Sequence, residues 1–307
     1  MTMSLTPTPP QVGSNLIDSP IKRHWQAYRQ SWLAVTALLV LCLILLVALL
    51  APFIAPQNPY DLAQVEVMDA RLAPGEKAMN GHPYLLGTDE QGRDMLSAML
   101  YGLRISVAVG LISTFVALGI GLLLGLWAGY QGGWVDTFIM RLADLQLAFP
   151  PILLALMLLA FLHQGVLNTI IALITVQWAT YARTARSSVL VEKQKEYIEA
   201  AQCLALPTRR ILLHHLLPNC LPPLMVVATV QIASAITLEA TLSFLGLGVP
   251  ITEPSLGLLI ANGFQYLLSG KYWISLFPGM ALLVTILAIN LVADQLRDVL
   301  NPRLEGR

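Results

Sequence analysis

The residues that could carry chemistry are few, and their spacing matches no enzyme. His214 and His215 are adjacent, so on a helix they would point about 100° apart and could not share one metal ion. The Gly270–Lys271 pair is followed by Tyr272 and belongs to no G-x-x-x-x-G-K-[ST] nucleotide loop. Neither a G-x-S-x-G nor an H-E-x-x-H pattern occurs. We therefore predict no catalytic residue, no metal site and no cofactor bound by this chain.

One acidic residue, Glu239, lies within a long apolar run, AITLEATLSFLGLG. A carboxylate is costly in such surroundings, so we expect it to face the interior of a helix bundle or a water-filled path. It either lines a pathway or is the structural partner of a polar group on another helix. Pro150 and Pro151 are further pathway candidates, because a proline pair kinks or breaks a helix and frees backbone carbonyl groups.

The segment KEYIEAAQCLALPTRRILLHHLLPN, residues 195–219, is a charged stretch between two long apolar runs. Residues 192–204 are good helix formers, and the spacing of one helix face is shared by Tyr197, Ala200, Ala201 and Leu204. Pro207 is placed to begin a second short helix after a turn at 205–207, and Pro218 is placed to end it. The segment is either a docking surface for a soluble partner or an amphipathic loop on the lipid surface.

The composition places these residues in a membrane protein. Apolar residues make up 56% of the chain, charged residues only 12%, and the mean hydropathy is +0.67. The apolar fraction and the mean hydropathy are higher, and the charged fraction lower, than in ordinary soluble domains. Basic and acidic residues number 18 each, so the net charge gives no sign of a nucleic-acid partner. We predict an all-α polytopic membrane protein.

Six apolar runs are long enough to cross about 30 Å of hydrocarbon as helices of about 20 residues. They cover residues 32–55, 105–128, 145–162, 166–181, 221–247 and 273–292. The third is interrupted by prolines and the fourth is diluted by polar residues, so a strict count gives five. With six spans and a cytosolic N-terminus, thirteen of the eighteen basic residues lie inside, as the positive-inside rule requires. We therefore expect six transmembrane helices with both termini in the cytoplasm.

This topology divides the chain into five parts. Residues 1–31 would form a cytoplasmic tail, 32–55 the first transmembrane helix, 56–103 an external segment, 104–294 a five-helix core with a cytoplasmic loop at 183–219, and 295–307 a cytoplasmic C-terminal tail. The three cysteines, Cys42, Cys203 and Cys220, are not placed to form an external disulfide.

Two local patterns predict how the second span begins and packs. Thr88 and Gln91 fit a capping box that would begin a short external helix, and Arg93 is expected to pair with Asp94. Further along, small residues recur every four positions at Ala117, Gly121, Gly125 and Gly129. Such a ridge lets a neighbouring helix approach closely, so we expect a packing role for it.

The charged segment resembles the EAA loop of ABC importer permeases, E-A-A-x3-G-x9-I-x-L-P. Five signature positions match in identity and spacing: Glu199, Ala200, Ala201, Leu217 and Pro218. Ala205 stands in place of the glycine and His215 in place of the isoleucine. In that family the loop carries the coupling helix, which docks in a groove of the cytosolic ATPase. If the turn requires φ > 0 at Ala205, alanine costs about 1 kcal/mol relative to glycine.

Other segments carry the same resemblance in the right order over residues 85–303. They are LLGTDEQGRDMLSAMLYGLRIS, GYQGGWVDTFIMRLADLQLAFPPILLAL, LEATLSFLGLGV and LRDVLNPR. They are similar to the dipeptide, oligopeptide and nickel branch of these permeases, and specifically to the second of its two paired membrane subunits. The resemblance implies a type I ABC importer permease architecture in a bacterial cytoplasmic membrane.

The resemblance also implies a function and a set of partners. The chain would be a permease subunit of an ATP-driven, binding-protein-dependent importer of short peptides, with a nickel chelate or another small solute as the alternative cargo. Its partners would be a second, non-identical permease subunit, two cytosolic ATPase subunits that carry ATP and Mg, an external substrate-binding protein and membrane lipid. A stand-alone secondary transporter with Glu239 as a proton or ion site is the alternative from another class, but it leaves the charged loop unexplained.

Overall fold

The computed structural model describes residues 25–26, 28–61, 65–79, 81 and 83–299, and within these ranges all regular secondary structure is helical. The predicted tails at 1–31 and 295–307 lie largely outside the described residues. The main helices are α2 (Trp32–Ile54), α3 (Met95–Gln131), α4 (Gly133–Leu147), α5 (Pro151–Leu162), α6 (Val166–Glu192), α7 (Glu196–Cys203), α8 (Thr208–Arg210), α9 (Leu217–Phe244), α10 (Leu256–Phe264) and α11 (Trp273–Val299). The other helical elements are two short 3-10 helices, η1 (Val67–Asp69) and η3 (Leu267–Ser269), and one π-helical segment, η2 (Ile211–Leu216).

The apolar runs become helices whose ends differ from the predicted ones. α2, α3, the continuous stretch Thr208–Phe244 and α11 are each long and apolar enough to cross a membrane. α4 and α5 pass the same test only together, with a bend of 93° at the break between them. Pro150 is the last residue of this break and Pro151 is the first residue of α5. α6 begins at the predicted residue but continues to Glu192, so residues 183–192, the start of the predicted cytoplasmic loop, belong to this helix. The described residues thus offer four or five spans, and the count of six stays a prediction.

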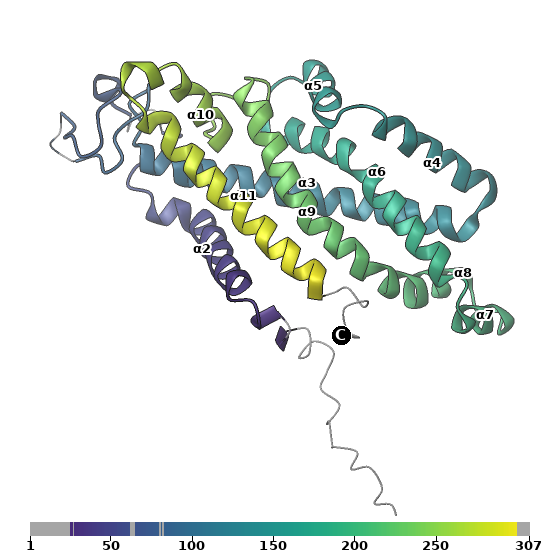
Figure 1. Cartoon of the computed structure of the whole chain (residues 1–307). Helices are drawn as coiled ribbons and strands as arrows, with labels where there is room; N and C mark the ends of the chain where they lie inside the picture. Colours follow the sequence, from purple (N-terminus) through teal and green to yellow (C-terminus); the bar gives the residue numbers. More distant parts are fainter. Residues whose placement is uncertain (1–24, 27, 62–64, 80, 82, 300–307) are drawn as a thin grey trace, which may run out of the picture.

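The long helices form one bundle in which α9 and α11 cross in front of α3 (Figure 1). α2 packs against α11 on the side that faces away from α9. The most extensive helix contact joins α3 to α6. All four ridge residues are buried there: Ala117, Gly121, Gly125 and Gly129. A Cβ atom built on Gly121 would lie 2.5 Å from the Cβ of Tyr181, and one built on Gly125 would lie 2.6 Å from the Cβ of Ala185. No side chain fits in such gaps, so this approach of the two backbones requires glycine.

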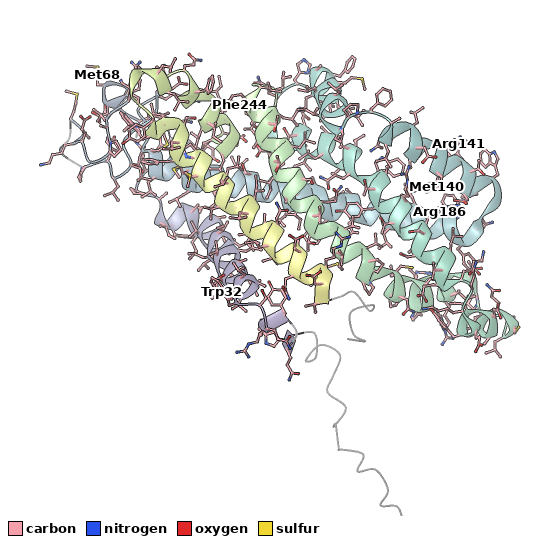
Figure 2. The ribbon with its side chains drawn as sticks, viewed as in Figure 1. Trp32, Met68, Met140, Arg141, Arg186 and Phe244 are labelled. Carbon is pink, nitrogen blue, oxygen red and sulfur yellow. The ribbon has the colours of Figure 1, made fainter. Side chains whose placement is uncertain are left out.

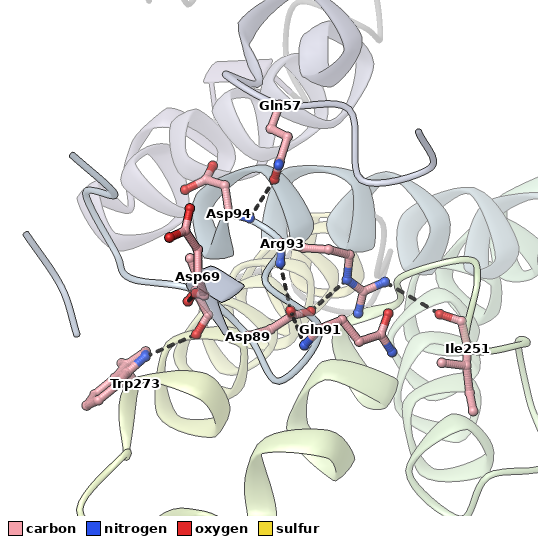
Figure 3. A network of polar contacts seen from close by, with 9 residues as sticks. Gln57, Asp69, Asp89, Gln91, Arg93, Asp94, Ile251 and Trp273 are labelled. Carbon is pink, nitrogen blue, oxygen red and sulfur yellow. Dashed lines mark hydrogen bonds and ion pairs between the residues drawn. The ribbon is translucent and has the colours of Figure 1, made fainter. Parts of the chain in front are cut away.

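The segment before α3 is held against the bundle by buried polar side chains (Figure 3). Asp89 accepts hydrogen bonds from the backbone N–H of Arg93 at 2.9 Å and from its Nε at 2.6 Å, and both side chains are almost fully buried. The Trp273 indole of α11 donates to the Thr88 carbonyl at 3.3 Å. Arg93 also donates to the Ile251 carbonyl at 3.4 Å. The segment is therefore fixed to both α11 and the loop that precedes α10.

The cap of α3 is Asp94, and the predicted capping box at Thr88 is wrong. The Asp94 carboxylate accepts a hydrogen bond from the Ser97 N–H at 2.8 Å, whereas the Thr88 hydroxyl bonds within the preceding loop. No separate short helix forms, because the helix that starts after Asp94 continues unbroken into the apolar run. Arg93 pairs with Asp89 in place of Asp94, since the Asp94 carboxylate is already engaged as the cap.

We expect Gly125→Leu to force α3 away from α6 and to destabilise the subunit by about 3 kcal/mol or more. Gly119→Leu is the matched control, because a Cβ atom on Gly119 of the same helix meets nothing within 4 Å. The thermal unfolding midpoint of the purified subunit in detergent measures both effects. Equal midpoints for the two variants would show that the close approach of α3 and α6 does not limit stability.

Candidate functional site

The charged segment forms a small helical projection at one end of the bundle. α7 and α8 lie at the tip of the molecule, at the end opposite to the segment that precedes α3 (Figure 1). α7 starts at Glu196, four residues later than predicted, because residue 192 still belongs to α6 and residues 193–195 form the turn between them. The projection is therefore joined directly to the long helix α6.

The turn after α7 is a Schellman motif with Ala205 in the left-handed conformation. The Leu206 N–H donates to the Ala201 carbonyl at 3.1 Å, and the Ala205 N–H donates to the Gln202 carbonyl at 2.9 Å. The φ angle of Ala205 is 54°, a region in which a Cβ atom is crowded and glycine is preferred. The turn therefore does require φ > 0 at Ala205, and alanine carries strain of about 1 kcal/mol relative to glycine here.

The predicted apolar face of α7 is divided in the structure, because Tyr197, Ala200 and Leu204 are exposed whereas Ala201 is buried. Ile198 and Ala201 pack into the bundle, in a cluster that also contains Ile211 and Leu216 of η2. The other side chains of α7 and the following Leu204 are exposed, and we call the side that carries Glu199, Ala200 and Leu204 the outer face of α7. Leu204 is 75% exposed and Tyr197 39%. Apolar residues occur on both sides of this short helix, so only the contact with η2 decides which side is buried.

α8, η2 and α9 form one continuous helical stretch of 37 residues, Thr208–Phe244, so the predicted helix end at Pro218 is wrong. The helix starts after Pro207 as predicted, passes through a π-helical turn at η2 and continues as α9. In the π turn the Leu217 N–H bonds to the Leu212 carbonyl. Pro218 follows in the first turn of α9, where the changed register of hydrogen bonds tolerates its missing N–H. Leu217 and Pro218 of the motif therefore lie inside a helix.

Glu239 of α9 is fully buried, and both of its carboxylate oxygens accept hydrogen bonds. The Ser106 hydroxyl of α3 donates to Oε2 at 2.8 Å, and the Ser243 hydroxyl donates to Oε1 at 2.8 Å. Ser106 Oγ also accepts from the Leu256 N–H at the start of α10, at 3.4 Å. The carboxylate thus lies where α3, α9 and α10 meet. This geometry corresponds to a structural partner for polar groups on other helices.

Two ion pairs that the sequence analysis did not identify tie α4 to α6. Arg186 donates two hydrogen bonds to Asp136, at 2.5 and 2.6 Å, and lies between the two helices (Figure 2). Arg183 binds Asp144 at 2.5 Å in a more exposed position. About 40 to 50 residues separate the partners, so no local spacing signals the pairs. They fix α4, the helix before the break, whereas the Pro150–Pro151 pair itself is exposed.

We expect Ala205→Gly to stabilise the chain by roughly 0.5–1 kcal/mol, because glycine adopts the left-handed conformation without strain. Ala200→Gly is the matched control: it changes the same residue type inside α7, where glycine should destabilise by a similar amount. The thermal unfolding midpoint should rise for the first variant and fall for the second. A fall for both would mean that the turn stores no strain.

The sequence matches two known protein families and several named relatives. The family of the binding-protein-dependent transport system inner membrane component matches residues 121–306, and the N-terminal TM domain of oligopeptide transport permease C matches residues 19–74. The di/tripeptide transport system permease protein DppC of Pseudomonas aeruginosa is 39% identical over 289 residues, 94% of each chain. The probable D,D-dipeptide transport system permease protein DdpC of Escherichia coli is 37% identical over 90% of this chain and 89% of its own.

A solved structure shares the fold. A chain of the MetNI methionine ABC transporter, in inward-facing conformations in the native crystal form, superimposes with a TM-score of 0.53 at 21% identity. The match covers 67% of this chain and 97% of that chain. The resemblance stated from the EAA loop is confirmed by these independent matches. Since the first family covers more than half of the sequence and the relatives align over nearly all of it, the chain belongs to the family of binding-protein-dependent transport system inner membrane components.

Proposed function

We propose that this chain is one of two paired, non-identical permease subunits of a bacterial importer that moves short peptides across the cytoplasmic membrane. The observation that carries the proposal is the exposed outer face of α7, on a helix anchored in the bundle and bearing the EAA residues. The relatives support peptides as cargo, because one is named a di/tripeptide transport permease and the other a probable D,D-dipeptide transport permease.

α7 would serve as the coupling helix. Its outer face presents Glu199 and Ala200 to solvent, and the small side chain of Ala200 lets another surface approach closely. The partners would be two cytosolic ATPase subunits, which would hold the ATP and Mg. Binding and closure of those subunits would then move α7, while this chain itself hydrolyses nothing.

The inner side of α7 supplies a route by which such movement reaches the membrane helices. Ile198 packs in one buried cluster with Leu216 of η2 and with Tyr181 and Val189 of α6. The same cluster includes Ala117 of the α3 ridge and extends along α9. A displacement of α7 would therefore shift α6, α9 and α3 together, because a close-packed core transmits strain.

The remaining parts of the proposal concern topology and the outer side. Six spans with both termini in the cytoplasm would place α7 inside and the 56–103 segment outside, where a substrate-loaded binding protein would dock. Large apolar side chains exposed along the helices would face lipid or the second permease subunit; they include Leu39, Leu43 and Phe53 of α2 and Leu153, Met157 and Phe161 of α5.

We expect Ala200→Glu to reduce ATP-dependent peptide uptake more than tenfold, since a bulky charge at the centre of an interface is poorly tolerated. Gln202→Glu adds the same charge on another side of α7 and should leave uptake within about twofold of wild type. Uptake is measured in vesicles that contain both permease subunits, the ATPase subunits and the binding protein. Correct insertion of the variant is checked by its amount in the membrane fraction. Unchanged uptake by Ala200→Glu would remove the basis of the docking proposal.

The secondary-transporter alternative makes a different prediction for Glu239. If Glu239 carried protons, vesicles with this chain alone would take up substrate under a pH gradient, and Glu239→Gln would abolish that uptake. We expect no such uptake from the wild-type chain, because the carboxylate is enclosed by Ser106 and Ser243. Uptake driven by the pH gradient without any ATPase subunit would favour the alternative.

A further inference from the structure

Three side chains, one each from α6, α7 and α9, meet at the start of α7. The Tyr197 hydroxyl in the first turn of α7 donates to Oε2 of Glu192, the last residue of α6, at 2.6 Å. The Asn219 amide in the first turn of α9 donates to the same Tyr197 oxygen at 3.1 Å. The contact therefore runs from α6 through α7 to α9. We call these three residues, Glu192, Tyr197 and Asn219, the clamp.

Each member of the clamp is itself held in place. Lys195 binds the other carboxylate oxygen of Glu192 at 2.6 Å, and the Glu192 side chain is only 13% exposed. The Asn219 amide also donates to the His215 carbonyl at 2.7 Å, which fixes its orientation on the helix. Burial and the hydrogen bond to the Glu192 carboxylate raise the pKa of Tyr197 to about 12. The tyrosine therefore keeps its proton, and remains a donor, throughout the physiological pH range.

α7 needs such a constraint because its other attachments are weak. A helix of eight residues is not stable by itself in water. Its own buried side chains are Ile198 and Ala201, both on one side, and these two contacts alone would leave it free to rock about its axis. The clamp holds its N-terminal turn to α6 with a hydrogen bond to the Glu192 carboxylate, which is stronger than a neutral one, and to α9 with a neutral hydrogen bond from the Asn219 amide.

We propose that Glu192 and Asn219 are positioning residues that make α7 move as one rigid body with α6 and α9, so that displacement of the coupling helix is passed to the membrane helices. This inference rests on the proposed function of α7, but it assigns a role that is separate from docking. The outer face would bind the ATPase subunits, and the clamp would convert their movement into movement of the bundle.

The rigidity of α7 is tested first, without any partner. Spin labels on the natural Cys203, which is exposed, and on Ser187→Cys of α6 report the distance between α7 and α6. Cys42→Ala removes the other exposed thiol, and Cys220 is buried. We expect one narrow distance distribution for this background and at least a twofold broader one after Glu192→Ala or Asn219→Ala. Glu192→Gln retains an acceptor for the Tyr197 hydroxyl and should restore the narrow distribution.

Coupling is tested in the complete transporter, as peptide taken up per ATP hydrolysed. We expect Glu192→Ala to lower this ratio about tenfold, the effect of losing a hydrogen bond to a charged group, and Asn219→Ala to lower it about fivefold, the effect of losing a neutral one. Binding of the ATPase subunits should change less than about twofold in both variants. Lys195→Ala is the matched control, since it removes the exposed contact to the same carboxylate and leaves the link from α6 to α9 intact. It should lower the ratio less than about twofold.

Three results would overturn the proposal: an unchanged distance distribution in Glu192→Ala, a loss of ATPase binding with an unchanged ratio, or an equal loss of the ratio in Lys195→Ala. The thermal unfolding midpoint of each variant separates a local loosening of α7 from general unfolding. Failure of the proposed function gives a different result, namely a wild-type chain that recruits no ATPase subunit. The distance between α7 and α6 can still be measured in that case, because the spin-label experiment needs no partner, and it shows whether the clamp holds α7 rigidly.

Discussion

In a lipid bilayer the hydrophobic effect does not drive one apolar helix onto another, so the approach of α3 to α6 depends on close packing. Gly121 and Gly125 let the α3 backbone lie directly on the Cβ atoms of α6. That contact places Tyr181 and Val189 of α6 in the buried cluster that also receives α7. The orientation of the helical projection formed by α7 and α8 thus depends on glycines in the middle of α3, where no side chain keeps the two backbones apart.

Polar side chains at the helix junctions supply directionality that apolar packing lacks. Glu239 joins α3, α9 and α10 through Ser106 and Ser243. At the far end of the bundle, Asp89 and Arg93 fix the segment before α3, and at the near end Glu192 and Tyr197 fix α7. Buried polar groups such as Glu239 and Asp89 are costly when unpaired, so these two networks favour one arrangement of their helices.

Much of the fold could be predicted from local patterns. The apolar runs, the break at the proline pair and the turn at Ala205 follow from hydropathy and from the conformational limits of proline and of residues with φ > 0. Features that depend on a distant partner were missed or misassigned. Asp94 replaces Thr88 as the cap because Thr88 is engaged by the loop around η1, and Pro218 continues a helix because the π turn before it changes the register.

The sequence by itself determined the class of protein and the approximate positions of the helices, because these depend on composition, on periodicity and on residues close together in the chain. Its resemblance to a known family singled out residues 195–219 as the segment for which we propose a coupling role. Only the tertiary structure decided which side of α7 is buried, which groups satisfy Glu239 and which helices the clamp connects. Glu192 and Asn219 are 27 positions apart, and Ser106 and Glu239 are 133 apart. Contacts at such separations are set by how whole helices pack, so no local pattern of residues encodes them.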